Sequence, residues 1–108
     1  MAIQSKVKFE GGSSRSELRP MYDLVPMVIW ETLAARFSLG VASHGKNNWK
    51  SGGEEFFDET KRHAMHHYLL WLDGDRSEDH LGAVLWNIGA LIWWEKIGKQ
   101  NVNKNTSV

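Results

Sequence analysis

Apolar residues recur with helical spacing along most of this 108-residue chain. From Met27 onward, large apolar side chains return every three to five positions, which indicates an amphipathic helix. Pro26 suits the first turn of such a helix, and Asp23 lies close enough to cap it. A glycine at position 40 or 45 is the expected end. The pattern predicts a first helix from Met27 to one of these glycines.

Two further helical patterns follow, joined by a short acidic turn. The first begins at Glu54, where acidic side chains favour a helix start, and stops at Gly74. The second is capped by Ser77 or Asp79 and runs to about Ile97. We expect the buried stripe of the first of these two helices to comprise Phe57, Ala64, Met65, Tyr68, Leu69 and Leu72.

The last of these helices contains a long apolar run. The run from Leu81 to Trp94 is 14 residues long, whereas a membrane span needs about 20, so a buried helix is expected. Gly82 and Gly89 are seven residues apart and therefore share one face. Their lack of a side chain lets another helix approach closely, which offsets a propensity cost of about 1 kcal/mol per glycine.

The remaining segments are a loop and two polar ends. Residues 44–53 have the glycine and asparagine content of a loop, which contains Trp49. This tryptophan can anchor the loop to the body or stack on a flat ligand, and anchoring is the commoner role. We expect an all-α fold, a small bundle of about three main helices at 21–98. An extended arm at 1–20, with a short strand at 6–9, precedes it, and a frayed polar tail at 99–108 follows.

Composition excludes several classes of function. Net charge is zero and the basic residues are scattered, so binding to nucleic acid is not expected. The absence of cysteine excludes disulfides and thiolate zinc sites, and the first residues lack the apolar stretch of a signal peptide, which together suit the cytoplasm. Six tryptophans favour a homo-oligomer, although a small core could also use them. The short apolar run means that no membrane contact is expected.

Polar residues interrupt the apolar sequence around the acidic turn. His67 lies two turns before the end of one helix and Asn87 two turns after the start of the next, so antiparallel helices place them at similar depth. Burying a polar group without partners costs roughly 1–3 kcal/mol, so these residues are either hydrogen-bonded architecture or a site. Carboxylates beside hydrogen-bond donors suit Mg²⁺-bound phosphate. The turn contributes Asp75, Glu78, Asp79 and His80.

Two other clusters are weaker candidates. His63 and His67 are four residues apart on one helix face, a spacing that can bind a metal, and His66 adds a third imidazole. Histidines on a helix more often have no ligand role. A set of four acidic residues could hold Mg²⁺, but acidic side chains are also favoured at the start of a helix, which is sufficient to explain their presence. The set consists of Glu54, Glu55, Asp58 and Glu59.

An ordered set of motifs covers about residues 17–95, and comprises Tyr22-Asp23-Leu24-Val25-Pro26, Asn48-Trp49, His67, Gly74-Asp75, His80-Leu81 and Trp86-Asn87. This order resembles a small, largely phage-encoded family, the dATP/dGTP diphosphohydrolase N-terminal domain. The resemblance implies a helical fold and metal-dependent hydrolysis of a purine deoxynucleoside triphosphate between the α and β phosphates. It also implies that the recurring positions of the family are occupied here by Asn48, Trp49, His67, Asp75, His80 and Asn87.

Two functions follow, and both stay open. A pyrophosphohydrolase would bind Mg²⁺, or another divalent metal, through Asp75, Glu78 and Asp79. His67, His80 and Asp79 would act in catalysis. The nucleotide would be bound by Asn48, Trp49, Asn87 and Lys46. Alternatively, the protein binds and sequesters a nucleotide or a nucleotide-derived signal without turnover, which the short acidic turn favours. A blander possibility is a structural protein whose tryptophans mediate assembly.

Overall fold

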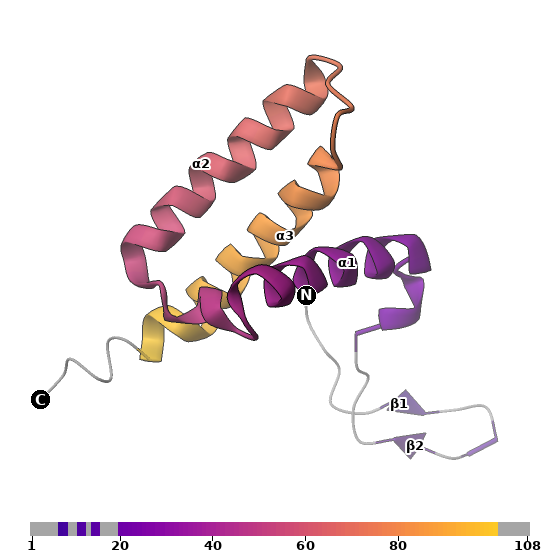
Figure 1. The fold of residues 1–108 in the computed structure, drawn as a ribbon. Helices are drawn as coiled ribbons and strands as arrows, with labels where there is room; N and C mark the ends of the chain where they lie inside the picture. Colours follow the sequence, from indigo (N-terminus) through magenta and orange to yellow (C-terminus); the bar gives the residue numbers. More distant parts are fainter. Residues whose placement is uncertain (1–6, 9–10, 13, 16–19, 102–108) are drawn as a thin grey trace, which may run out of the picture.

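Three helices make up the body of the protein in the computed structural model (Figure 1). The structure describes residues 7–8, 11–12, 14–15 and 20–101. The helices are α1 (Met27–His44), α2 (Gly53–Leu72) and α3 (His80–Trp93). The predicted all-α bundle is therefore confirmed, and each of the three expected helices forms close to its expected bounds.

Short turns flank the helices. The 3-10 turns η1 (Tyr22–Leu24) and η2 (Asn48–Ser51) precede α1 and α2, and the π-helical turn η3 (Trp94–Gly98) extends α3. The third helical segment thus continues to Gly98, as the sequence indicated. Within the described residues no helix is long and apolar enough to cross a membrane.

A two-stranded hairpin lies in the N-terminal segment. Strand β1 (Val7–Lys8) pairs antiparallel with β2 (Ser14–Arg15). The strand expected at 6–9 is thus found at its two central residues. Positions 6 and 9, most of the predicted arm, and residues 102–108 of the predicted tail lie outside the described residues.

The turn between α2 and α3 is built by local chemistry. Gly74 has a φ of 92°, a conformation that glycine adopts without steric cost, and it ends α2 as expected. At the start of α3, the Gly82 N–H donates to Asp79 Oδ1 at 2.9 Å, so Asp79 is the predicted cap. The predicted cap of α1 is wrong, because Asp23 lies in η1 and the extended Val25 separates it from the helix start at Pro26.

α1 crosses α3 at two glycines of α3, Gly82 and Gly89. A methyl group at Gly82 would lie 3.1 Å from Thr32 Cγ2, and one at Gly89 would lie 4.0 Å from Leu33 Cδ1. The expected close approach of another helix at these glycines is confirmed. α2 runs beside α3 on another side, so α3 is the central helix (Figure 1).

Aromatic rings form the core at the C-terminal end of α3. The Trp49 ring lies 5.1 Å from that of Trp93 and 5.7 Å from that of Trp86, both in edge-to-face geometry. Phe57, which is 1% exposed, stacks on Trp94 at 4.6 Å between ring centroids. Such pairs add about 0.5–1.5 kcal/mol each beyond their buried area. The loop tryptophan therefore anchors η2 to the helices.

The predicted buried stripe of α2 is correct at only two of its six members. Phe57 and Ala64 are buried, but the other four members are exposed, namely Met65, Tyr68, Leu69 and Leu72. The line that faces α3 instead continues through Thr60 and His67, at the three- and four-residue steps of a helix. Thr60 and His67 place polar side chains on the inner face of α2, so the apolar pattern of this helix does not coincide with its buried face.

Candidate functional site

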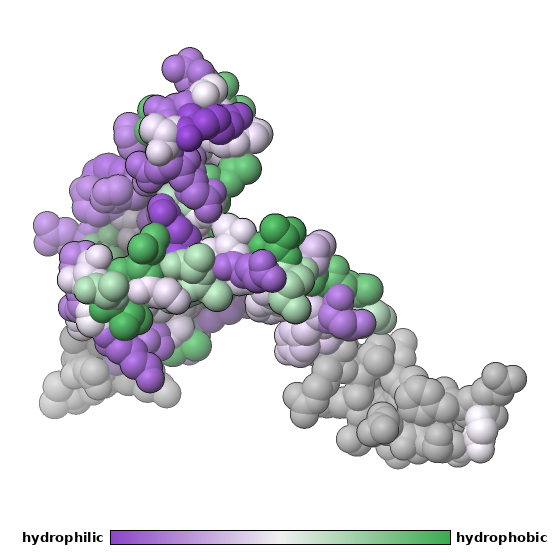
Figure 2. Space-filling view, turned by 45° about the vertical axis from the view of Figure 1, so that its right-hand side comes forward, coloured by the Kyte–Doolittle hydropathy of each residue, from purple (hydrophilic) through white to green (hydrophobic). Residues whose placement is uncertain are grey.

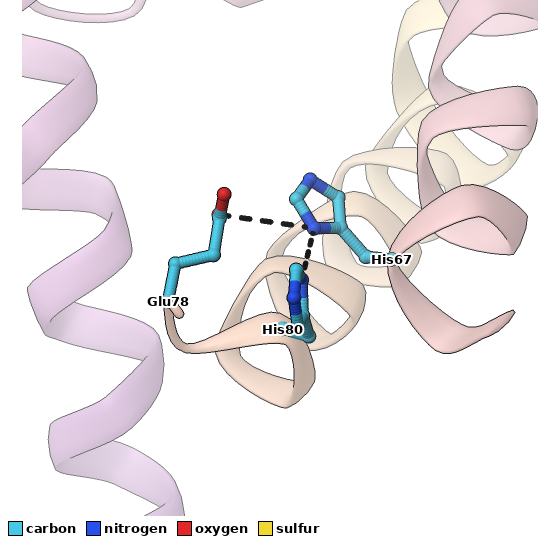
Figure 3. Close-up of side chains that lie close together, drawn as sticks. All are labelled: His67, Glu78 and His80. Atoms are coloured by element: carbon cyan, nitrogen blue, oxygen red, sulfur yellow. Dashed lines mark hydrogen bonds and ion pairs between the residues drawn. The ribbon is translucent and has the colours of Figure 1, made fainter. Parts of the chain in front are cut away.

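Two histidines from different helices meet at the α2–α3 turn. His67 Nδ1 lies 2.9 Å from His80 Nδ1, and Glu78 Oε1 lies 3.8 Å from the same His67 nitrogen (Figure 3). His80 is 2% exposed, whereas the Glu78 side chain is 52% exposed. One possible ligand atom from each residue lies within 4.8 Å of the other two. In the described part of the chain, this is the group with metal-ligand geometry.

Asp75 fixes the orientation of His80. Its Oδ1 lies 3.1 Å from His80 Nε2 and also accepts hydrogen bonds from the Ser77 N–H at 2.8 Å and the Ser77 hydroxyl at 2.6 Å. Because a carboxylate only accepts, His80 Nε2–H must be the donor. In neutral His80 the Nδ1 lone pair then faces His67 and Glu78. A carboxylate behind an imidazole is the usual support of a metal-binding histidine.

Charge at the site is set by these contacts. The hydrogen bonds from Ser77 and His80 hold the pKa of the Asp75 carboxyl well below its usual range, so it is ionised. Burial lowers the pKa of His67, and the nearby His80 and Arg36 act in the same direction against Glu78. His67 is therefore neutral near pH 7, the state in which it can bind a metal.

Arg36 connects α1 to this group. Its guanidinium Nη2 lies 3.9 Å from Glu78 Oε1, and its side chain is 22% exposed. The sequence contains a signal for the involvement of Arg36 in the site. Arg36 lies on the helix face that carries Leu33 and Gly40, and a cation in such a line is unusual unless it has a partner. Arg36 was not among the predicted site residues.

A groove adjoins Arg36 between the three helices, and we call it the Trp86 groove. It consists of three pockets of about 210, 190 and 330 Å³, all of which share Trp86 as a wall. Asn87 lines two of the pockets, and its Nδ2 donates to the Ala83 carbonyl at 2.7 Å. The other walls include Arg36, Gly40, His44, Asn48, Trp49, Phe56, Thr60 and His63.

The structure thus brings together most of the predicted site residues. Asn48, Trp49 and Asn87 share the groove, but Trp49 is held by neighbouring aromatic rings, which favours the anchor role over stacking on a ligand. Asp75 supports His80 instead of joining the candidate ligand set. Asp79 caps α3 and lies outside that set. Lys46 is exposed in the loop before η2.

The weaker candidates other than His67 lie outside the His67–Glu78–His80 group, although His63 and Glu59 line one pocket of the Trp86 groove. His63 Nδ1 contacts the Glu59 carbonyl at 3.0 Å, and the ring of His66 lies 6.0 Å from that of His67. In the acidic set at the start of α2, Asp58 pairs with Lys61 at 3.0 Å and Glu59 pairs with Arg62. These exposed pairs agree with a solvated helix face.

The comparisons with known proteins assign the family. A family model described as "dATP/dGTP diphosphohydrolase, N-terminal" matches residues 10–104. The chain therefore belongs to this family, and the resemblance seen in its motifs is confirmed. No curated protein and no solved structure matches the chain. The family name links the chain to hydrolysis of purine deoxynucleotides, with a divalent metal as the expected cofactor.

Proposed function

We propose that this member of the family hydrolyses a purine deoxynucleoside triphosphate to the monophosphate and pyrophosphate. Water would add to the α phosphorus, and the bond from that phosphorus to the α–β bridging oxygen would break. The observation that carries the proposal is the convergence of His67, Glu78 and His80, three potential ligands of a divalent metal, beside the Trp86 groove.

The donor chemistry of the three residues fits a divalent metal. Two imidazole nitrogens and one carboxylate oxygen suit Zn²⁺, Mn²⁺, Co²⁺ or Fe²⁺, whereas Mg²⁺ prefers oxygen ligands. Asp75 supports this fit, because it keeps the His80 Nδ1 lone pair directed at the group. When bound, the metal would stabilise charge on the phosphates and lower the pKa of a water molecule. We therefore expect a transition metal to serve at least as well as the Mg²⁺ predicted from the sequence.

The groove offers contacts for the nucleotide. Arg36 lies between the groove and Glu78, so its guanidinium can bind phosphate oxygens at the border of the two regions. Asn87 and Asn48 lie farther along the same groove, where amide groups can recognise the edge of a base. Trp86, which lines all three pockets, supplies an apolar wall for the base.

A product assay tests the proposal. The protein is incubated with the four deoxynucleoside triphosphates and with Mg²⁺, Mn²⁺, Zn²⁺ or a chelator, and products are separated by ion-exchange chromatography. We expect monophosphate and pyrophosphate from a purine substrate only when metal is present. Glu78→Gln should abolish turnover, and Glu55→Gln, an exposed substitution away from the groove, should not. Equal turnover by the Glu78→Gln variant would contradict the assignment of Glu78.

One observation favours the alternative of a binding protein without turnover. The candidate ligand set contains a single carboxylate, Glu78, and this side chain is more than half exposed and close to Arg36. A site with so little negative charge could bind the triphosphate directly through Arg36 and the histidines. In that case the nucleotide would be retained in chelator and released unchanged after heat denaturation.

A further inference from the structure

One side of the central helix α3 is apolar, and none of the residues that the structure describes covers it. From Leu81 to Trp94 the helix contains no charged residue. α2 packs along α3, α1 lies against the glycines of α3, and Ala83 and Ala90 are 2% and 0% exposed. The third side carries Leu81, Ile88 and Ile92, which are 43%, 44% and 50% exposed. A helix that is apolar all round is normally covered on every side.

The uncovered residues of α3 have the spacing of a helix–helix seam. Together with the half-buried Leu85 they follow one another at steps of four, three and four residues, through Leu81, Leu85, Ile88 and Ile92. This is the a/d pattern by which apolar side chains of one helix fit between those of another. We call these four residues the α3 stripe.

α2 extends this apolar surface. Met65, Tyr68, Leu69 and Leu72, which we call the α2 flank, are between 46% and 65% exposed. A surface pocket spans α2 and α3 on one side and is lined by Asp58 and Glu95. Met65 follows Asp58 by seven residues and Ile88 precedes Glu95 by seven, so both share the side of that pocket. The stripe and the flank therefore border one continuous face.

The area of this face matches what a dimer requires. Apart from Leu85, the stripe and the flank comprise seven large apolar side chains, each about half exposed. They present roughly 700 Å² per chain, and two chains would bury about 1,400 Å², within the 1,200–2,000 Å² of stable interfaces. None of the residues of the stripe or the flank is charged. The pocket between them carries both acidic residues (Glu54, Asp58 and Glu95) and basic ones (Lys61 and Lys99), so the face can pack against itself about a two-fold axis. We infer that a second copy of this chain packs against the α3 stripe and the α2 flank.

Exposed hydrophobic residues at the start of α1 form an alternative surface to which a second chain could bind. A substitution there also serves as the control for a substitution at Ile88. Val28 is 65% exposed, and green hydrophobic residues follow the ridge formed by α1 in Figure 2. Val28 lies one helical turn before Thr32, the α1 residue that lies against Gly82, and it belongs to neither the stripe nor the flank. A partner bound at α1 would make substitutions there, and not at Ile88, change the assembly.

Sedimentation velocity of the full chain tests the inference. We expect the wild type to sediment as a dimer of the 12.4-kDa chain. Ile88→Glu should weaken the dimer at least tenfold, because it places a charge in an apolar interface, while Val28→Glu should leave it unchanged. A monomeric wild type, or an unchanged dimer of Ile88→Glu, would overturn the inference. Circular dichroism checks that the Ile88→Glu variant keeps its helices, which its surface position favours.

Cysteine cross-linking decides the matter if the glutamate variant does not fold. The chain contains no cysteine, so Ile88→Cys and Val28→Cys each carry a single thiol. Under mild oxidation we expect a covalent dimer of Ile88→Cys, since position 88 lies near the middle of the α3 stripe. A covalent dimer of Val28→Cys alone would place the contact at α1 and overturn the inference, as would the absence of cross-linking in both variants.

Discussion

At the scale of single residues, the site depends on the tautomer of one buried histidine. Asp75 accepts the Nε2–H of His80, which leaves the Nδ1 lone pair facing His67 and Glu78. Without that acceptor either ring nitrogen of neutral His80 could carry the proton, and the Nδ1 lone pair would face His67 and Glu78 only part of the time. The carboxylate therefore prepares His80 as a ligand although it is not itself in the ligand set.

We expect Asp75→Asn to lower the affinity for metal by about 10–100-fold, the usual effect of losing such a supporting group. An amide accepts a weaker hydrogen bond than a carboxylate, and it can also rotate to present its NH₂ group to His80. Calorimetric titration of the metal-free protein with Mn²⁺ or Zn²⁺ measures this change. Asp73→Asn, an exposed substitution in the same turn, is the control and should bind as the wild type does.

The lowered pKa of His67 predicts a dependence of stability on pH. Burial favours the neutral imidazole in the folded protein, whereas the unfolded chain has the ordinary pKa of about 6.5. Above this pH both states are neutral at His67 and its titration has no effect. Below it the unfolded state binds the proton more readily, so the free energy of unfolding falls. In chelator, the wild type should lose more thermal stability between pH 7.5 and 5.5 than His67→Gln does.

The control for this experiment is His66→Gln, which removes the neighbouring exposed imidazole. This variant should keep most of the pH dependence of the wild type, because His67 stays buried and the charge of His66 has only a minor influence on the pKa of His67. The interpretation fails if His67→Gln and the wild type lose the same number of degrees on acidification.

At the scale of elements, α3 begins at a residue with two possible roles. Asp79 caps the helix through the Gly82 N–H, and the sequence also suggested it as a metal ligand and catalytic group. Asp79→Ala should cost about 1 kcal/mol of unfolding free energy, measured by urea denaturation. Asp79→Asn should restore most of this stability, because asparagine is an equally good cap. If Asp79→Asn retains full turnover and metal binding, the role of Asp79 is to cap α3. If the variant loses turnover or metal binding, Asp79 is also a metal ligand.

The elements also show what the sequence could predict. Helix ends follow local rules, so the end of α2 at Gly74 and the Asp79 cap of α3 were predictable. The close approach of α1 was predictable because Gly82 and Gly89 share one face of α3. The inner face of α2 was not, because it carries Thr60 and His67, whereas apolar Met65, Leu69 and Leu72 lie outside. The apolar pattern of a helix identifies its inner face only where that face carries no functional polar residues and the outer face does not bind another chain.

The sequence predicts which residues near the turn belong to the candidate site, but it does not predict how they are arranged in space. Sequence spacing placed His67, Glu78 and His80 near one turn, but only the packing of α2 on α3 brings the two imidazole nitrogens to 2.9 Å. Arg36 is 31 residues or more from these histidines in sequence, and its approach to Glu78 depends on the crossing of α1 over α3. Such long-range geometry leaves no periodic signal along the chain.

At the scale of the whole molecule, the site joins all three helices. His67 comes from α2, His80 opens α3, Glu78 lies in the turn before it, and Arg36 reaches Glu78 from α1. The core beneath is small, with Phe57 as the large side chain that is fully buried among the described residues. A ligand that holds two of these helices together should therefore contribute a large share of the net stability.

We accordingly expect a bound metal to stabilise the entire fold. A ligand at one hundred times its dissociation constant adds about 2.7 kcal/mol, which for a domain of this size corresponds to a rise in Tm of about 10 °C or more. Differential scanning fluorimetry with Mn²⁺, Zn²⁺ or Mg²⁺ against chelator measures it. His67→Gln should lose the rise and His66→Gln should keep it. If His67→Gln retained the full rise, the metal would bind elsewhere, and the histidine pair would be hydrogen-bonded architecture whose role is to hold α2 against α3.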